Sequence, residues 1–576
     1  MERLRSGLEA LERTPGIERH AEVVALLLEA GELEQGLLDH QLEMLGRERP
    51  TPVAQSAADL TLGISQALLW SFRFTGQLPV WESKRSAPPL VGVGSALRAM
   101  KKLESARVPA EIGVVVPEGY AFYGVYPETY LRAAEQLRDE WPGALRVVGI
   151  RSIGTSLAAV VAAAGKGDTS ASVRPGGHPF ARTVSIGERM RGKLLSAVDA
   201  TGSRRPLFAV VDEGPGLSGS SFGAMADWLE ENGVSPDQIV FFPSHRGPLG
   251  PHASERHRQR WETARKYVVE FEELFLGEGS PWPLQRWVED LTGPSEEIAD
   301  IGAGRWRDRF SRKRPPAHTQ QERRKYLLKA GGKTWLLKFA GLGRYGREKL
   351  ELASELSGFI PPVTGLRHGF LVGPWLEEAR PLPLVPDVDR EALLDRVARY
   401  ISHRARKLPA QRPGASPEKL LEMAAHNVEQ AVGKKAAKAL GAWRDRLPEL
   451  SSLARPVLTD NRMHAWEWVV TPDGKIWKTD ALDHHASNDL VGPQDPAWDL
   501  AGAIVELELS AEEQGRLVEQ VERSRRVKSP PDQLRFYIQM YLAFQMGYYT
   551  LAAEAVEGEA DALRKRAKWY ADRYSQ

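Results

Sequence analysis

Short apolar runs that alternate with helix-length segments dominate the middle of the chain. Runs rich in Val, Ile and Phe occupy residues 112–116, 146–150, 207–211 and 239–242, and helix-length stretches separate them. Such alternation predicts a parallel α/β sheet whose strands are buried on both faces. Because ligands bind these sheets at the carboxyl ends of the strands, the residues that follow each run are the first candidates for a functional site.

The pattern changes on both sides of this region. Leucines and valines recur at helical spacing before it, and after it a stretch rich in Pro, Gly, Trp and Arg precedes two apolar runs around Gly331-Gly332, which predict a β-hairpin. We therefore predict four parts: a helical N-terminal extension over 1–75, the α/β domain over 76–275, a linker over 276–320 and an α+β domain over 321–576.

Composition narrows the class of protein. The 77 basic and 76 acidic residues leave a net charge of +1, which makes a large nucleic-acid or anionic membrane surface unlikely. The chain has no cysteine, so disulfides, thiolate metal sites and cysteine nucleophiles are excluded. Residues 1–13 lack the apolar core of a signal peptide, and no apolar stretch approaches the roughly 20 residues of a membrane span. We expect a cytoplasmic protein without a membrane partner that forms a homodimer.

The run at 207–211 leads into the stretch with the clearest chemistry, Asp212 to Ser221, with the sequence DEGPGLSGSS. A helix is predicted over 222–231. A loop between a strand end and a helix start offers free N–H groups and the positive end of the helix dipole to an anion. Two carboxylates beside an anion would repel it unless they bind another part of the ligand, such as ribose hydroxyls or magnesium. The stretch therefore predicts a site for a phosphorylated sugar.

This stretch resembles the PRPP-binding motif of type I phosphoribosyltransferases, in the glycosyltransferase class. In that motif two acidic residues precede a Thr/Ser-Gly-x-Thr/Ser loop, which Asp212-Glu213 and Ser218 to Ser221 match. The spacer is one residue longer and contains Gly-Pro, as expected of a divergent member of the kind found in bacterial stress-linked gene clusters. An ordinary Gly/Ser turn with two solvated acids is the alternative. The resemblance implies that Asp212 and Glu213 hold the ribose of Mg-PRPP, while its 5′-phosphate is bound by Gly216, Ser218, Gly219, Ser220 and Ser221.

Two further loops follow predicted strands of the same domain. The loop after 146–150 resembles the pyrophosphate loop of these enzymes, which implies that Arg151 stabilises the departing diphosphate. A plain turn with a surface arginine is the alternative. Residues 173–182 are rich in Gly and Pro and predict a mobile lid, or else a disordered surface loop. The implied PRPP ligands from the two loops are Ser152, Gly154, Thr155, Arg174 and Arg182, and His178 is a third lid residue.

An aromatic segment, residues 117–130, follows the run at 112–116. Its rings could stack on a base while Glu118 binds the polar edge, although an aromatic mini-core is an equal alternative. We therefore predict a nucleobase-like acceptor that contacts Glu118, Tyr120 and Tyr123, with His245 after the last run as a further candidate.

The C-terminal domain carries a second set of motifs. Lys338 ends the second hairpin run, a helix with Glu351 follows, and the sequences VLTDNRMH at 457–464, GKIWKTD at 474–480 and DPAWDL at 495–500 come later. The order resembles the aminoglycoside phosphotransferase-like kinases, which implies a two-lobed fold with a hinge at 370–378. It further implies that Lys338 and Glu351 bind ATP phosphates, Asp460 orients or deprotonates the acceptor hydroxyl, and Asp480 and Asp483 hold Mg²⁺.

This second resemblance has departures. The His-Gly-Asp of the family is Leu-Thr-Asp here, and the asparagine expected five residues later is absent, with Asn461, His464 or Glu467 as substitutes. An active kinase and a non-catalytic kinase-like domain both remain open. The adjacent His484 and His485 are interpreted as surface residues, since no matching metal ligands accompany them.

Together the motifs predict a bifunctional enzyme that uses PRPP, ATP and Mg²⁺. One activity is phosphoribosyl transfer to a nucleobase-like acceptor, or the reverse pyrophosphorolysis. The other is ATP-dependent phosphorylation of a small-molecule or nucleotide-like product. The alternative is a PRPP- or nucleotide-sensing regulatory protein that has lost turnover.

Overall fold

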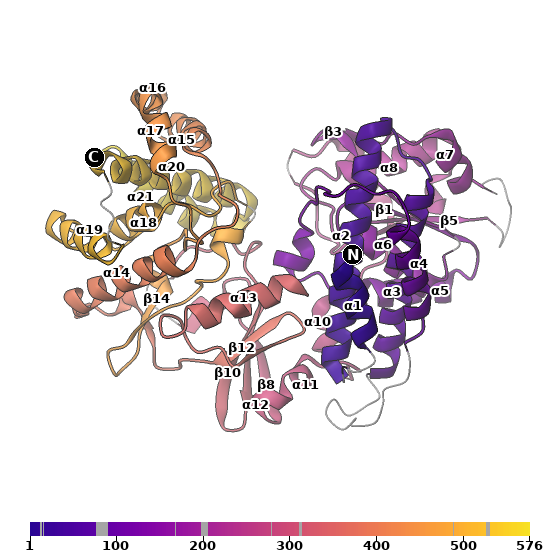
Figure 1. Cartoon of the computed structure of the whole chain (residues 1–576), viewed down its shortest axis with the longest axis horizontal. Coiled ribbons are helices and arrows are strands. Elements are labelled where there is room, and N and C mark those ends of the chain that lie inside the picture. The colour runs from indigo at the N-terminus through magenta and orange to yellow at the C-terminus, as the bar shows by residue number, and fades with distance from the viewer. Residues whose placement is uncertain are drawn as a thin grey trace. The chain divides into compact units, whose positions relative to one another are not determined.

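The computed structural model describes the chain except for residues 12–13, 15, 76–89, 168, 197–204, 251, 278, 310–313, 488 and 526–529. The described residues form two compact units (Figure 1). Unit 1 contains residues 1–295, 339–347 and 366–370, and unit 2 contains 296–338, 348–365 and 371–576. In the described part of the chain, no helix is long and apolar enough to cross a membrane.

The N-terminal residues are helical, as predicted, and they belong to the body of unit 1. Helix α2 packs on α3, and α3 packs in turn on α6, which lies beside the sheet. Val23, Val24 and Leu27 of α2 are buried, which explains the apolar spacing seen in the sequence. The helices are α1 (Glu2–Ala10), α2 (Gly16–Leu45), α3 (Pro52–Thr75) and α4 (Val93–Glu104).

Unit 1 contains the predicted parallel sheet. Its strand order is β2-β1-β5-β6-β7, and every neighbouring pair is parallel. Phe222, Met225 and Leu229 of α8 share a core with Val148 and Val210 of the central strands. The strands are β1 (Leu145–Ile150), β2 (Thr169–Val173), β5 (Leu207–Val211), β6 (Ile239–Phe242) and β7 (Arg265–Lys266).

One predicted strand does not form. Residues 112–116 have no regular secondary structure, and the side chains of Val114, Val115 and Val116 are exposed. The carbonyl oxygen of Val115 accepts a hydrogen bond of 2.9 Å from Nε2 of Gln35 on α2, so a helix side chain binds this backbone instead of a strand. β-branched composition favours a strand only where a partner strand packs beside it.

The remaining elements of unit 1 connect the sheet to its surroundings. The predicted lid, residues 173–182, contains a two-stranded hairpin of its own, β3–β4. The other elements are η2 (Gly119–Tyr123), α5 (Pro127–Glu140), α6 (Gly154–Gly165), β3 (Gly176–His178), β4 (Ala181–Thr183), α7 (Glu188–Leu194), α8 (Ser220–Glu231), η4 (Pro236–Gln238), α9 (Glu255–Thr263), α10 (Phe271–Phe275), α11 (Leu284–Trp287) and α12 (Glu289–Thr292).

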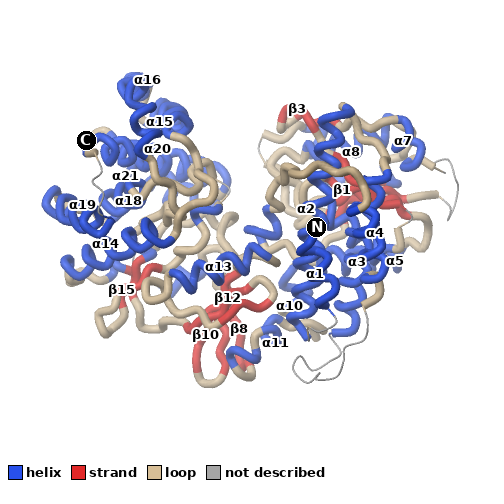
Figure 2. Tube along the Cα trace, viewed as in Figure 1, coloured by secondary structure: helices blue, strands red, loops and turns tan. Residues whose placement is uncertain are grey.

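A second five-stranded sheet, which belongs mainly to unit 2, has the order β11-β12-β10-β9-β8 (Figure 2). The predicted hairpin is confirmed as β9–β10, because Gly331 and Gly332 both have positive φ, as a two-residue hairpin turn requires. The strands are β8 (Ser295–Asp300), β9 (Lys325–Ala330), β10 (Lys333–Phe339), β11 (Gly365–Arg367) and β12 (Phe370–Pro374), with α13 (Arg344–Glu355) after β10.

The segment 276–320, predicted as a linker, is folded over much of its length. It contains β8, which adds to the second sheet, and η5 (Arg305–Arg309). The prediction relied on charge and proline content, but Trp306 anchors the segment by donating a hydrogen bond of 2.8 Å from Nε1 to Glu322.

The rest of unit 2 is mostly helical. Trp498 of α18 and Phe536 and Tyr541 of α20 form the centre of its core. The elements are β13 (Arg380–Pro381), η6 (Leu382–Leu384), α14 (Arg390–Lys407), α15 (Pro417–Ala431), α16 (Lys434–Ala439), η7 (Leu440–Arg446), α17 (Leu447–Leu453), η8 (Ala465–Glu467), β14 (Trp468–Val470), β15 (Ile476–Lys478), η9 (His484–Ala486), α18 (Ala497–Glu506), α19 (Ala511–Arg525), α20 (Pro531–Ala555), η10 (Glu557–Glu559) and α21 (Ala560–Tyr574).

Candidate functional site

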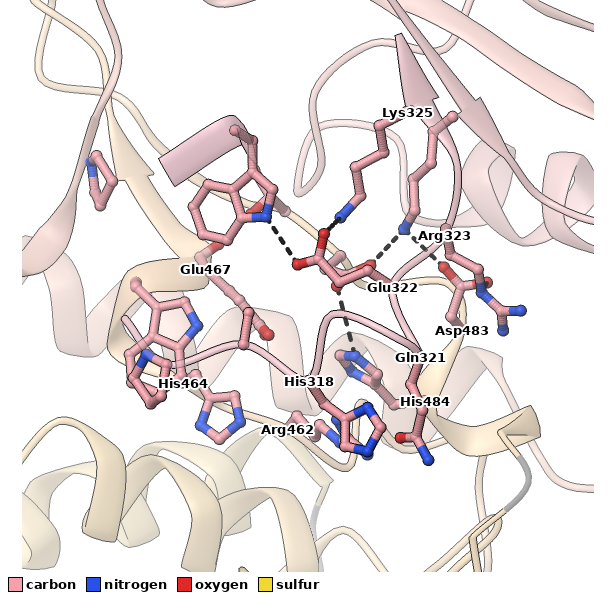
Figure 3. A pocket seen from close by; sticks show the side chains of 18 of the residues that line it. His318, Gln321, Glu322, Arg323, Lys325, Arg462, His464, Glu467, Asp483 and His484 are labelled. Atoms are coloured by element: carbon pink, nitrogen blue, oxygen red, sulfur yellow. Dashed lines mark hydrogen bonds and ion pairs between the residues drawn. The ribbon is translucent and has the colours of Figure 1, made fainter. Parts of the chain in front are cut away.

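A cavity of about 280 Å³ lies within unit 2 (Figure 3). Leu336 and Lys338 of β10 line one part of it, and residues of the segment 462–487 line another. Tyr548 and Tyr549 of α20 complete the wall. The second sheet, two of the predicted kinase motifs and the C-terminal helices therefore meet at one cavity.

Lys338 stands at the centre of a charge cluster in this cavity. Its Nζ donates to Asp480 and, over 2.7 Å, to Oδ2 of Asp483, and Lys349 Nζ of α13 lies 2.6 Å from Oδ1 of Asp483. Burial lowers the pKa of Lys338, but the two carboxylates outweigh it and hold that pKa above its ordinary value. Lys338 in turn holds the pKa of Asp480 and of Asp483 well below the usual range, against the effect of burial. The cluster is thus charged at neutral pH.

Glu351 does not take part in this cluster, contrary to the prediction. Its side chain is exposed, and Lys349 occupies the inward position on α13. Lys349 and Glu351 are two residues apart, which is about 200° around a helix, so they lie on opposite faces and the packing of α13 decides which one points inward. Lys338 therefore pairs with carboxylates from the segment 480–483 instead of a glutamate on α13.

Asp460 is fully buried behind the cavity wall. Tyr400 donates to its Oδ2 over 2.5 Å, Lys478 Nζ lies 3.2 Å from the same oxygen, and His484 Nδ1 lies 3.5 Å from Oδ1. Burial raises the pKa of Asp460, but the positive charges of Lys478 and His484 outweigh it, so the carboxyl is ionised at neutral pH. Glu467 and His484 line the cavity in its place.

His484 links the two acids that the sequence singled out. Its Nε2 lies 3.7 Å from Asp480 Oδ2. Burial lowers the pKa of His484, but the contacts with Asp460 and Asp480 outweigh it and raise that pKa to about 9. The interpretation of His484 as a surface residue is therefore wrong. The sequence signal that could have identified it is its position four residues after Asp480.

The DPAWDL segment holds the loop that carries Asp460. Asp499 of α18 accepts hydrogen bonds from the backbone N–H of Asp460 over 2.8 Å and of Asn461 over 3.0 Å. Asn461 has a φ of +68°, a conformation that costs free energy unless its surroundings hold it. Nδ2 of Asn461 also donates to the carbonyl oxygen of Gly492 over 2.8 Å. Two motifs predicted separately from the sequence thus form one hydrogen-bonded unit.

The donor set of the cavity fits an oxygen-binding divalent cation. Asp480, Asp483 and Glu467 supply carboxylate oxygens to the wall, which are the ligands that Mg²⁺ prefers. Ligand atoms of the enclosed Asp460 and of Glu467 and His484, which line the cavity, lie within 4.8 Å of one another. The predicted ligands Asp480 and Asp483 are thus placed together, and both currently bind Lys338.

A second candidate site lies in unit 1, after β5. Asp212 Oδ1 accepts the N–H of Glu213 over 2.8 Å, and Glu213 Oε2 accepts the N–H of Gly119 over 2.6 Å. Burial raises the pKa of Asp212 to about 7. Burial and the charges of Asp212 and Glu118 raise the pKa of Glu213 to about 8. Backbone N–H groups bind both acids, and among the described residues no ion pair is formed with either, so hydroxyl groups or a cation of a ligand would stabilise them.

Two glycines bring neighbouring loops against this strand end. A Cβ atom on Gly154, at the start of α6, would lie 2.5 Å from the carbonyl oxygen of Val211. A Cβ atom on Gly119 would lie 2.3 Å from Oε2 of Glu213. The approach at Gly154 is to a backbone atom and leaves no room for a side chain, whereas at Gly119 the nearest atoms belong to side chains that would have to shift. The loop after β1, with Ser152 and Thr155, therefore meets the loop after β5, as the sequence predicted.

The serine loop contacts the hairpin β3–β4. Ser218 and Ser220 both donate from Oγ to the carbonyl oxygen of Pro179, over 2.9 and 2.6 Å. Gly219 has a φ of +63°, and α8 begins at the next residue. Gly216 is exposed at the tip of the loop, and Ser221 is in the first turn of the helix. The hairpin thus occupies the hydroxyls that the resemblance assigns to phosphate.

Arg151 and Arg174, which the resemblance assigns to PRPP, both form ion pairs with Asp39 of α2. Arg151 is buried, with NH1 donating to Asp39 over 2.9 Å and NH2 paired with Glu48. Arg174 donates to Asp39 and, over 2.9 Å, to Gln35. Both guanidinium groups are therefore neutralised by α2 and the loop after it. Arg182, in β4, is only partly buried, and the charges of Arg174 and Arg182 both lower the pKa of Asp212 against the effect of burial.

The predicted acceptor residues differ in whether a ligand could reach them. Tyr120 is buried and its hydroxyl lies 2.9 Å from Ser156 Oγ, so it packs inside the unit and cannot stack on a ligand. Glu118 lies close enough to raise the pKa of Glu213, and Tyr123 is exposed. His245 is exposed after β6, and its Nδ1 accepts the N–H of Gly247 over 3.0 Å.

The sequence matches no protein-family model and no curated protein. Solved kinase structures align with about half of the chain. Choline kinase LicA from Streptococcus pneumoniae is 16% identical over 50% of this chain and 98% of its own, with a TM-score of 0.35. A macrolide 2′-phosphotransferase type I is 15% identical over 49% and 95%, with a TM-score of 0.34. The spectinomycin phosphotransferase APH(9)-Ia, with ADP and spectinomycin, is 12% identical over 50% and 93%, with a TM-score of 0.33.

Proposed function

We propose that unit 2 is an ATP-dependent phosphotransferase that acts on a hydroxyl group of a small molecule. The observation that carries this proposal is the cluster of Lys338, Asp480 and Asp483 in the cavity. Kinases place a lysine on the third strand of a sheet, beside a metal-binding aspartate, to hold the ATP phosphates. Lys338 lies on β10, the third strand of its sheet in chain order, and Asp480 is its partner.

The cavity lining offers suitable surfaces to both parts of ATP. Ile301, Leu336, Trp375 and Val469 offer apolar surface to the base. Lys338 would exchange its carboxylate partners for phosphate oxygens, and Asp480 and Asp483 would then hold Mg²⁺. That ion supplies charge neutralisation for the phosphates when bound.

The remaining side chains can position the acceptor hydroxyl. The γ-phosphoryl transfer forms an O–P bond to the acceptor, breaks the bond to ADP and releases the hydroxyl proton. Glu467, which lines the cavity, would accept the hydrogen bond of that hydroxyl, since Asp460 is enclosed behind it. His484, protonated at neutral pH, would stabilise negative charge in the cavity.

Nucleotide binding tests the proposal. Lys338→Met should weaken the affinity for a non-hydrolysable ATP analogue with Mg²⁺ by at least about tenfold in isothermal titration calorimetry, since it removes a charge-assisted contact. Lys475→Met is the matched control, because Lys475 is an exposed lysine of the same unit that pairs with Asp473. Equal affinity of the Lys338→Met variant and the native protein would refute the assignment.

We propose a second candidate function, phosphoribosyl transfer, for unit 1. It is supported by the acids Asp212 and Glu213 at the end of β5, with Ser218 to Ser221 and the Gly154 loop beside them. In this reaction a nitrogen or carbon nucleophile bonds to the anomeric carbon of PRPP as the bond to diphosphate breaks. The two acids would hold the ribose hydroxyls and stabilise positive charge on the sugar. Ser218 and Ser220 would bind the 5′-phosphate after the β3–β4 hairpin moves away.

Pyrophosphate release from Mg-PRPP, measured across nucleobases and amines, tests this candidate. The double variant Asp212→Asn/Glu213→Gln should abolish release. If PRPP binds to the native protein but no acceptor liberates pyrophosphate, the transferase proposal fails and a PRPP-sensing role is favoured.

A further inference from the structure

One part of the cavity wall in unit 2 is basic and aromatic. His318, Arg462 and His464 gather there (Figure 3), and the side chains of Trp466 and Tyr548 also line the cavity. We call these five residues the basic wall. The charge cluster around Lys338 does not include them, so the basic wall is available to contact the acceptor.

The rings of the basic wall already carry cations of the protein. The guanidinium carbon of Arg462 lies 4.1 Å from the centre of the Tyr548 ring, and that of Arg566 lies 5.0 Å from the Trp466 ring. His464 also stacks on Trp466, with centroids 4.4 Å apart. Aromatic cages bind quaternary ammonium groups through ring faces that are free. These rings are therefore poorly suited to a cationic acceptor.

The carboxylates that line the cavity are also paired with cations. Glu322 lies 3.5 Å from Lys325 Nζ, and Glu467 accepts from Lys478 Nζ over 2.8 Å. Asp480 and Asp483 bind Lys338. A cationic acceptor would have to compete with a lysine for every one of these acids.

The hydrogen-bond donors of the basic wall are better placed to bind an anion than a cation. Arg462 is 14% exposed, and Asp489, the carboxylate that pairs with it over 3.6 Å, does not line the cavity. Among the described residues, buried Nε of Arg462 and Nδ1 of His318 have no hydrogen-bond partner. Arginine suits phosphate oxygens because its planar guanidinium presents several N–H donors in a fixed fork.

From this wall we infer that the acceptor of unit 2 is a small alcohol that bears a phosphate group, held by Arg462 and His318. The inference rests on the proposed phosphotransferase function and specifies its substrate class. A nucleotide, which the second candidate reaction would produce, belongs to this class.

The test compares phosphoryl transfer from ATP to acceptors of different charge. We expect transfer to ribose 5-phosphate or nucleoside 5′-monophosphates, and at least tenfold lower kcat/KM with ribose, nucleosides, choline or streptomycin. Arg462→Gln and His318→Gln should each raise the acceptor KM by about 10- to 100-fold and change the ATP KM by less than about threefold. Arg516→Gln is the matched control, because Arg516 pairs with Glu391 on the surface of the same unit.

The possible results distinguish a failure of the proposed phosphotransferase function from a failure of the inference about its acceptor. If the protein does not bind ATP, the proposed function fails, and the inference falls with it. If ATP binds but choline or streptomycin is the better acceptor, or neither variant changes the acceptor KM, only the inference is overturned. If no acceptor is phosphorylated, ribose 5-phosphate is titrated into the complex with a non-hydrolysable ATP analogue, in the Asp212→Asn/Glu213→Gln background that disables unit 1. Binding that both variants weaken supports the inference, and absence of binding overturns it.

Discussion

Asp499 holds in place the loop that contains Asp460 and Asn461, which we call the Asp460 loop. The substitution Asp499→Asn changes this contact and leaves the size of the side chain almost the same. The amide can still accept one of the two backbone N–H groups of Asp460 and Asn461, but its NH₂ group faces the other. Loss of one hydrogen bond to a charged acceptor costs about 1.5–3 kcal/mol. The left-handed conformation of Asn461, a strain of about 1–3 kcal/mol, then loses one of the contacts that hold it, so the loop can relax away from its native position. We expect unit 2 to lose about 3 kcal/mol of stability.

The effect on turnover follows from the position of the loop. A displacement of about 1 Å near reacting groups can reduce the rate by about 100-fold, so Asp499→Asn should lower kcat by about 10- to 100-fold. Steady-state ATP consumption with a productive acceptor gives kcat, and the ATP KM should change by less than about threefold. Urea denaturation followed by tryptophan fluorescence gives the free energy of unfolding.

Asp495→Asn is the matched control for this prediction. Asp495 also accepts two backbone N–H groups, those of Arg455 and Ala497, both over 2.9 Å. It should therefore lose comparable stability but retain kcat within about threefold, because neither partner belongs to the Asp460 loop. Equal losses of kcat in both variants would show that general destabilisation accounts for the effect and would refute the positioning role of Asp499.

Three further predictions concern unit 1. Gly154→Ala should destabilise it by about 2–4 kcal/mol in chemical denaturation, since the new Cβ would lie 2.5 Å from the carbonyl oxygen of Val211. An unchanged denaturation midpoint would contradict this close approach. Burial raises the pKa of Glu34 to about 7, so the folded state retains a proton that the unfolded state loses. The free energy of unfolding should therefore fall as pH rises from about 4.5 to 7, and Glu34→Gln should remove a pH dependence worth about 3 kcal/mol. If the native protein and the variant lose stability in parallel over this pH range, Glu34 is not the group responsible. Ser220→Ala removes a hydrogen bond of 2.6 Å to Pro179, worth about 1 kcal/mol, and should speed amide hydrogen exchange in the β3–β4 hairpin. If the hairpin amides keep the same protection against exchange, the serine does not hold the hairpin.

The elements that could be predicted are those whose cause is local. Strand β5, its acidic end, the serine loop and helix α8 are contiguous in the sequence, and so are the two strands around Gly331-Gly332. In each case the apolar run, the turn residues and the following element specify the same structure. The approach of Gly154 to β5 could also be anticipated, because parallel strands bring their carboxyl ends to one edge of the sheet.

The elements that could not be predicted depend on partners far away in the sequence. Asp39 lies 112 residues before Arg151 and 135 before Arg174, and it neutralises both. The run at 112–116 has the composition of a strand, yet it lies beside Gln35 of α2. The inward position of Lys349 depends on how α13 rotates about its axis.

The sequence by itself determined where the two groups of acids and their loops occur, because a strand end, a turn and a helix start are specified by neighbouring residues. Only the tertiary structure decided which charges remain free to act. Arg151 is neutralised by α2, and Asp460 is enclosed by Tyr400 and Lys478. Arg462 lines a cavity, and its Nε has no hydrogen-bond partner among the described residues. Electrostatic pairing acts over a few ångströms in space and is independent of distance along the chain, so it can be assigned only after the chain has folded.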